Sequence, residues 1–300
     1  MKRKKIAIAM STFNEGALAV KAIRSIFESK TRALVTAVVV DDGSNQDHVD
    51  AIYALSERFS GLRFIPREHR ERGIARCEAI EEALKENPDF IVFLDADMIL
   101  DHNAIEHCIQ TCDETNCGAV LIREVCFSNY KNFATQVKVF ERNIINNSRS
   151  PISSNSIEAA RFWKREAWLQ SGGLNAKQVS FEEIQPTIRY LKQGGRIERQ
   201  RNAVLYHDEK EVTFDNLFFK KGYYFSAMYS TGETEENGFL EMLQRWYPFR
   251  SVYYERQNIK SYVKHPILAS GVFAMYSGLT AVAAKNLGSE FLKRKKNTEQ

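Results

Sequence analysis

In the first third of the chain, three short apolar runs each end in a polar turn that carries an acid. The runs are residues 6–10, 34–40 and 90–94, and the turns are 12–15, 41–44 and 95–97. Stretches with helical spacing separate them at 17–28, 49–59 and 74–85, and 62–65 indicates a further short strand. Alternation of strands and helices predicts a mostly parallel sheet with helices on both faces, an α/β fold.

Ligands of open parallel sheets bind beyond the carboxyl ends of the strands, so we expect the three turns to meet at one edge. The second half is less regular, with strands predicted at 118–125 and 204–206 and helices at 136–146 and 164–170. From about residue 214 the composition becomes aromatic and basic. We therefore predict an α/β domain over residues 1–210 and a mainly helical region over residues 211–300.

The composition is that of an ordinary globular protein, with 300 residues, 44% hydrophobic and 27% charged. The net charge of +4 is mild and by itself argues neither for nor against nucleic acid, and we expect no nucleic-acid partner. The five cysteines include no CxxC pair, which is typical of reduced thiols in the cytoplasm. For Cys108, Cys112 and Cys117, a half-buried helix face followed by a turn is favoured over a zinc site.

Asp95-Ala96-Asp97 is the sharpest chemical signal in the sequence. Residues two apart at a strand end point to the same side, and two neighbouring carboxylates repel each other unless a cation lies near them. Mg²⁺ or Mn²⁺ suits oxygen ligands and often completes its shell with phosphate oxygens. The pair thus predicts a metal site for a diphosphate ligand, against the alternative of an ordinary acidic turn.

Two other turns offer groups for a nucleotide. A carboxylate of Asp41 or Asp42 can accept hydrogen bonds from a base or ribose, although Asp and Gly are also common in simple turns. Thr12 and Phe13 offer a hydroxyl and a ring face to a nucleobase, with core packing as the alternative for the ring.

Two arginines lie one helical turn apart, at Arg72 and Arg76. Guanidinium groups pair well with phosphate oxygens, so both could face one ligand. Because the surrounding segment is densely charged, a solvated charged face is the alternative.

Taken in order, these segments resemble the family-2 glycosyltransferases, and the resemblance covers about the first 210 residues. The matching segments are Ser11-Thr12-Phe13-Asn14-Glu15, Val40-Asp41-Asp42-Gly43-Ser44, Gly73-Ile74-Ala75-Arg76 and Phe93-Leu94-Asp95-Ala96-Asp97. The third match is the loosest, since Cys77 replaces an asparagine. The resemblance implies a nucleotide-diphospho-sugar transferase fold, an inverting mechanism, Mn²⁺ or Mg²⁺, and a nucleotide-sugar donor. It implies donor contacts at Thr12, Phe13, Glu15, Asp41, Asp42 and Arg72, and metal or diphosphate contacts at Asp95 and Asp97.

The resemblance continues through 172–174, 181–183 and 190–195, and implies a general base at the last acid of the second segment. That acid is Glu183, one methylene longer than the aspartate of the family, and Glu182 is the alternative. A positioned carboxylate is needed because an acceptor hydroxyl does not ionise near neutral pH. His207 resembles a histidine that completes the metal site in relatives, although a single histidine is often only a surface or core residue.

The C-terminal region fits a membrane interface. Residues 266–284 carry no charge but are poor in Leu and Ile, so we favour an interfacial or buried helix over a spanning one. Similar tails occur in relatives that glycosylate polyprenyl-linked lipids. We therefore expect a glycan or lipid-linked acceptor in cell-envelope glycan synthesis, and peripheral attachment to an anionic membrane surface on its cytoplasmic face.

Two other functions compete with this prediction. A nucleotidyltransferase of a related fold would normally need a glycine-rich loop with a lysine after the first strand, which residues 11–16 lack. A catalytically silent scaffold protein would not need the acids that stand at every expected position.

Overall fold

The computed structural model describes residues 2–70, 72–152, 158–176, 182–230 and 250–298. The elements of the first two thirds are β1 (Lys5–Thr12), α1 (Ala17–Phe27), β2 (Leu34–Asp41), α2 (Gln46–Arg58), β3 (Leu62–Pro66), α3 (Arg72–Leu84), β4 (Phe90–Asp95), β5 (Met98–Leu100), α4 (Ala104–Thr115), β6 (Ala119–Phe127), α5 (Phe133–Ile145), β7 (Phe162–Lys164), α6 (Arg165–Gln170), α7 (Gln185–Lys192) and β8 (Ile197–Asp208). The later elements are α8 (Phe214–Ser230), η2 (Ser251–Tyr254), α10 (Arg256–Lys264) and α11 (Pro266–Thr298).

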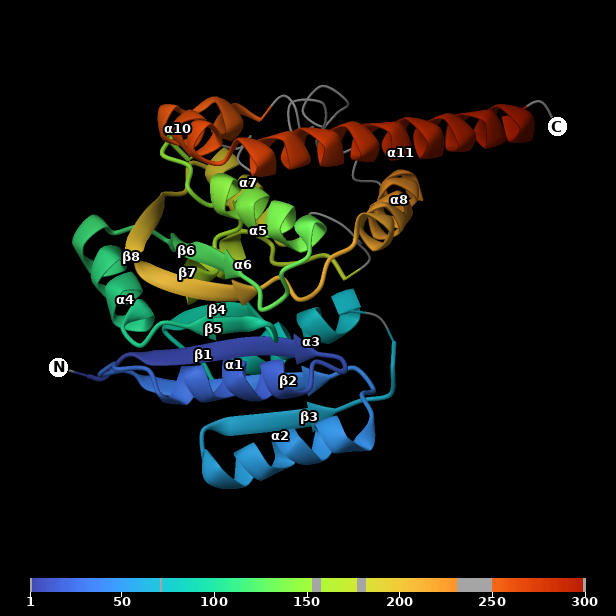
Figure 1. Ribbon diagram of the computed structural model, residues 1–300. Coiled ribbons are helices and arrows are strands. Elements are labelled where there is room, and N and C mark those ends of the chain that lie inside the picture. The colour runs from blue at the N-terminus through green and yellow to red at the C-terminus, as the bar shows by residue number, and fades with distance from the viewer. Residues whose placement is uncertain (1, 71, 153–157, 177–181, 231–249, 299–300) are drawn as a thin grey trace. The chain divides into compact units, whose positions relative to one another are not determined.

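Eight strands form one sheet in the order β3-β2-β1-β4-β7-β6-β8-β5 (Figure 1). Strands β3, β2, β1 and β4 are parallel, whereas β7 runs antiparallel to β4 and β6, and β5 runs antiparallel to β8. In the parallel half, Ser11 is in register with both Val40 and Asp95. The ends of β1, β2 and β4 therefore lie at one level, and the three polar turns share one edge of the sheet.

Helices cover both faces of this sheet, as predicted. Side chains alternate along a strand, so neighbouring residues enter opposite cores. Ile8 packs in a cluster with residues of α1, α2 and α4, whereas Ala9 packs in a cluster with residues of α3, α6 and α7. Each large apolar side chain buried in this way contributes about 1.5–3 kcal/mol, and this explains the continuous apolar runs of β1, β2 and β4.

The antiparallel half differs most from the expectation. Strands β5 and β7 have three residues each, too few for a recognisable periodicity. Strand β8 has 12 residues, far more than the three predicted at 204–206, because its first half is polar and only partly buried. Cys108, Cys112 and Cys117 are fully buried free thiols, not a half-buried face, since α4 packs against the sheet.

Contacts divide the chain into two compact units. The first comprises residues 1–125, 152–177 and 182–208, as far as these are described, and holds the whole sheet except the end of β6. The second includes residues 126–151 and 209–300. Its described elements are the helices α5, α8, η2, α10 and α11. It has a small core of its own, made of Val137, Leu217, Val272, Met275 and Leu279.

Candidate active site

A buried histidine joins the turns that follow β1 and β2. His48 Nδ1 lies 2.9 Å from the amide nitrogen of Gly16, which can only donate, so the ring proton is on Nε2. Nε2 lies 3.1 Å from Thr12 Oγ1 and 3.6 Å from Asp41 Oδ1. Burial lowers the pKa of His48 and outweighs the opposing effect of Asp41 and Glu15. A neutral imidazole therefore holds these two turns together.

The carboxylate of Asp41 stabilises the turn that follows it. It is buried, and its Oδ2 accepts hydrogen bonds from the amides of Gly43 and Ser44 at 3.2 and 2.9 Å. Gly43 has φ +84°, and a Cβ there would lie 2.6 Å from the backbone nitrogen of His69, so the turn requires glycine. These contacts give Asp41 a structural role in its own turn, and the donor contact predicted for it stays a prediction.

Asp42 and Phe13 lie together on the other side of this turn. Asp42 Oδ1 accepts a hydrogen bond from the amide of Arg70 at 2.9 Å, and Oδ2 lies 3.1 Å from His69 Nδ1. The Phe13 ring lies 4.8 Å from the His69 ring and is 46% exposed, so it is a surface group and not a core one. An exposed ring beside a carboxylate is an arrangement that can stack on a base and bind its polar edge.

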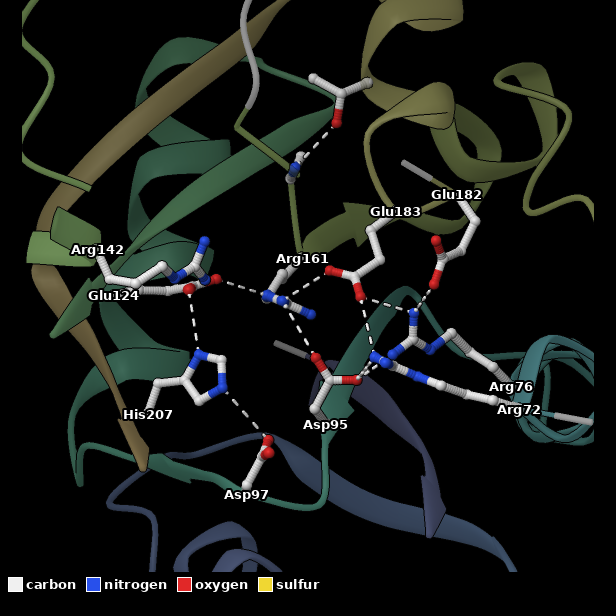
Figure 2. A network of polar contacts seen from close by, with 12 residues as sticks. Arg72, Arg76, Asp95, Asp97, Glu124, Arg142, Arg161, Glu182, Glu183 and His207 are labelled. Atoms are coloured by element: carbon white, nitrogen blue, oxygen red, sulfur yellow. Dashed lines mark hydrogen bonds and ion pairs between the residues drawn. The ribbon is translucent and has the colours of Figure 1, made fainter. Parts of the chain in front are cut away.

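At the end of β4, arginines converge on three carboxylates (Figure 2). Arg76, on α3, has a side chain only 5% exposed, and it pairs with Asp95, with Glu182 at 2.8 Å and with Glu183 at 2.7 Å. Arg72, 57% exposed, lies 3.4 Å from Asp95 and 3.5 Å from Glu183. The alternative of a solvated face is therefore wrong for Arg76, and the two predicted arginines do face one site.

A third arginine, which the sequence analysis did not single out, completes this group. Arg161 is also 5% exposed, and its Nη2 lies 2.9 Å from Glu183 Oε2 and 3.4 Å from Asp95 Oδ2. Its Nε donates to Glu124 Oε1 at 2.9 Å. The available signal was an arginine between two alanines and Phe162-Trp163, since a charge inside an apolar run is rarely buried without a partner.

Asp97 and His207 lie on the other side of Glu124. His207 is paired with Met98 in the β5–β8 ladder, and its Nε2 lies 3.5 Å from Asp97 Oδ1. Its Nδ1 lies 3.6 Å from Glu124 Oε2. A chain of contacts thus joins Asp95 to Asp97 through Arg161, Glu124 and His207, and both carboxylates belong to one cluster (Figure 2).

The charges of the cluster set the protonation of its acids. Burial would raise the pKa of Asp95, but Arg76, Arg161 and Arg72 together hold that pKa well below its usual range. Burial and Asp95 would raise the pKa of Glu183 too, and the same three arginines lower it. The pKa of Glu182 is raised, chiefly by burial, against the effect of Arg76. Glu183 is therefore the better-ionised carboxylate of the pair.

The sequence predicted that a metal would offset the repulsion between the carboxylates of Asp95 and Asp97. At Asp95, guanidinium groups provide the positive charge instead. Asp97 Oδ1 and His207 Nε2 lie 3.5 Å apart, and the carboxylate offers the oxygen ligand that Mn²⁺ and Mg²⁺ prefer. Asp95 would have to exchange its arginine contacts for the metal.

Solved structures resemble the fold. A mannosyltransferase, PcManGT from Pyrobaculum calidifontis in complex with GDP-Man and Mn²⁺, matches with a TM-score of 0.60 and 16% identity, covering 96% of this chain and 88% of its own. S. aureus TarS matches with a TM-score of 0.54 and 14% identity, covering 85% of this chain and 44% of its own. A shorter TarS structure, residues 1–349, gives a TM-score of 0.52 at 12% identity, covering 94% of this chain and 88% of its own. At such identities the likeness shows the fold alone.

The sequence itself gives the family. No curated protein matches the chain significantly. Residues 7–167, more than half of the chain, match the family described as Glycosyl transferase family 2. The match spans the three acidic turns, Arg161 and the strand β7 that follows it. With the nucleotide-diphospho-sugar transferase fold and the acidic cluster at the sheet edge, this match shows that the chain belongs to glycosyl transferase family 2 and is a glycosyltransferase that uses a nucleotide sugar.

Proposed function

We propose that the protein transfers a sugar, with inversion, from a UDP- or GDP-linked donor to an acceptor hydroxyl. One observation carries the proposal: Glu183 lies in the same cluster as Asp95 and three arginines, at the sheet edge where β1, β2 and β4 end. Such a cluster can bind a diphosphate and present a base to the sugar beside it.

The reaction needs a proton acceptor and a leaving group. In the proposed step, Glu183 takes the proton of the acceptor hydroxyl while that oxygen forms a bond to the anomeric carbon. The bond from the anomeric carbon to the diphosphate breaks, and its electron pair leaves with the nucleoside diphosphate. A single displacement from the opposite side inverts the configuration. Both glutamates contact Arg76, but the pKa of Glu182 is raised by burial whereas arginines lower that of Glu183, so we assign the base to Glu183.

The donor nucleotide and the metal occupy different parts of the edge in this proposal. Phe13 and Asp42 would bind the base and ribose, and Arg72 and Arg76 the diphosphate. Asp97 and His207, with Asp95 as a further predicted ligand, would hold Mn²⁺ or Mg²⁺. When bound, the ion stabilises the negative charge of the departing diphosphate.

A donor-hydrolysis screen tests this function. We expect the protein with Mn²⁺ to hydrolyse at least one sugar among UDP- and GDP-linked donors. D97A should lose activity, whereas D113A, at a surface aspartate of α4, should keep it. Hydrolysis of none of the donors, together with no thermal stabilisation by UDP or GDP with Mn²⁺, would favour a scaffold. Full turnover by D97A would refute the metal assignment.

We also propose a glycan or polyprenyl-linked acceptor in envelope glycan synthesis, reached from the cytoplasmic face of an anionic membrane. One helix segment, Pro266–Asn286, is long and apolar enough to cross a membrane by length and composition alone. Only 28% of its most apolar window is buried. Exposed aromatic side chains, including Phe219 and Tyr223, occur in the same unit, as do the exposed lysines Lys220 and Lys264. Rings at headgroup level with nearby lysines suit such a surface.

A further inference from the structure

The backbone of Arg161 is held by hydrogen bonds to two strands of the sheet. Its amide donates to the carbonyl of Val120 at 3.3 Å, and its own carbonyl accepts from the amide of Phe93 at 3.2 Å. The guanidinium carbon lies 5.5 Å from the centre of the Phe93 ring. The residue is thus held between β4 and β6, the strands that carry Asp95 and Glu124.

The side chain of Arg161 then bridges carboxylates that come from distant parts of the chain. Nε faces Glu124, and Nη2 faces both Glu183 and Asp95. Glu124 in turn contacts His207, which contacts Asp97. Arg161 and Glu124 therefore form a two-residue bridge from the proposed base to the proposed metal ligands.

Fold stability alone gives a poor account of this bridge. Buried ion pairs contribute little net stability, because the desolvation of both charges offsets their attraction. Nη1 of Arg161 is buried as well, and no residue that the structure describes accepts a hydrogen bond from it. Leaving a buried donor unsatisfied is unfavourable. Apolar side chains in place of both Arg161 and Glu124 would avoid both penalties.

We propose that Arg161, anchored by Glu124, is a positioning residue that fixes the orientation of the base Glu183 relative to the bound donor. The inference rests on the proposed function of Glu183. Arg76 and Arg72 also contact Glu183, but they come from α3 and are the groups we expect to turn to the diphosphate when the donor binds. Arg161 comes from the sheet, so it holds the base while those two exchange partners.

The test compares R161M with R161K and E124Q. We expect R161M to lower kcat by about tenfold, less than the hundred- to ten-thousandfold contribution typical of general base catalysis, because Glu183 itself is kept. Its Kd for the nucleoside diphosphate with Mn²⁺ should stay within about threefold of the wild type, since nucleotide contacts lie elsewhere. R161K, which keeps one charged donor but not the fork, should restore part of kcat. E124Q should lower kcat less, because Glu183 keeps its own contact with Nη2.

R199M is the matched control, because Arg199 is another largely buried arginine of this unit and pairs with Glu158. It should leave kcat unchanged. Wild-type kcat in a folded R161M or R161K would overturn the positioning role. So would a fall in nucleotide affinity as large as the fall in kcat. If R161M does not fold, R161K and E124Q decide. A wild type that processes no donor but binds nucleotide would instead refute the proposed function.

Discussion

At the scale of single residues, protonation of His48 affects the contacts that join the turns after β1 and β2. The native pKa of His48 lies below the value of 6.5 expected for the unfolded chain, and the groups that face the ring are Asp41 and Glu15. As the pH falls, the unfolded chain therefore takes up this proton first. The contribution of a neutral His48 to the free energy of unfolding is complete above pH 6.5 and is lost as the pH falls through the native pKa.

We expect H48Q to show a flatter dependence of the free energy of unfolding on pH in that range than the wild type. Urea titrations at several pH values on both sides of 6.5 measure it. H102Q removes an exposed histidine and should keep the wild-type slope. Equal slopes in H48Q and the wild type would show that the ring does not titrate in this way.

Residues of the site differ in how far the sequence could predict them. Asp95 and Asp97 follow an apolar strand directly, and Glu183 falls in a family motif, so position alone singled them out. Arg161, Glu124 and His48 stand in no such pattern. Their partners lie far away in the sequence, and only the sheet order brings β4, β6 and β8 together.

At the scale of elements, a buried carboxylate joins helices of the second unit. Glu141 of α5 pairs with Lys138 at 2.8 Å and accepts hydrogen bonds from the hydroxyls of Tyr253 and Tyr276, which lie on η2 and α11. Burial would raise the pKa of Glu141, but Lys138 and the hydroxyl of Tyr276 lower it to about 2. The ionised form therefore stabilises the folded state at neutral pH, and this contribution is lost as the pH falls from 4.5 through about 2.

Removing that charge leaves Lys138 buried without its carboxylate. We expect E141Q to lower the free energy of unfolding by about 3–5 kcal/mol, as other broken buried pairs do. E114Q, on the exposed surface of α4, should stay within about 0.5 kcal/mol of the wild type. Chemical denaturation monitored by circular dichroism measures both, and equal values for the two variants would contradict the role of Glu141.

Among the elements, the parallel strands and the helices between them were predictable from sequence, whereas most of the antiparallel half was not. Strands β1, β2 and β4 are apolar runs because both of their faces are buried, and α1 and α3 have clear helical spacing. Of the antiparallel strands, β6 was predicted at 118–125, whereas β5, β7 and the polar first half of β8 carry no such signal. Their pairing depends on the order of the sheet, which a local pattern does not contain.

At the scale of the whole molecule, the second unit has exposed apolar side chains on α11, a helix whose other side packs in the core of that unit. On α11, Val272, Met275 and Leu279 are buried against Val137 and Leu217, whereas Ile267 and Phe273 are 72% and 76% exposed. One buried side and one exposed side is the arrangement expected of a helix that lies in an interface. Exposed lysines on α8 and α10 would face anionic headgroups.

Flotation with liposomes tests this attachment. We expect the wild type to float with anionic vesicles, and to do so less at high salt because screening weakens the lysine contacts. I267E/F273E should lose most of this binding, since it places two carboxylates on the exposed side of α11 without touching its packed side. Y53E introduces the same charge at a ring of α2 that is 46% exposed, and should float like the wild type. Donor hydrolysis should be equal in all three proteins, because the proposed donor site lies in the first unit. If the wild type stays at the bottom of the gradient with anionic vesicles, the proposed membrane attachment is wrong, and the proposed lipid-linked acceptor loses its support.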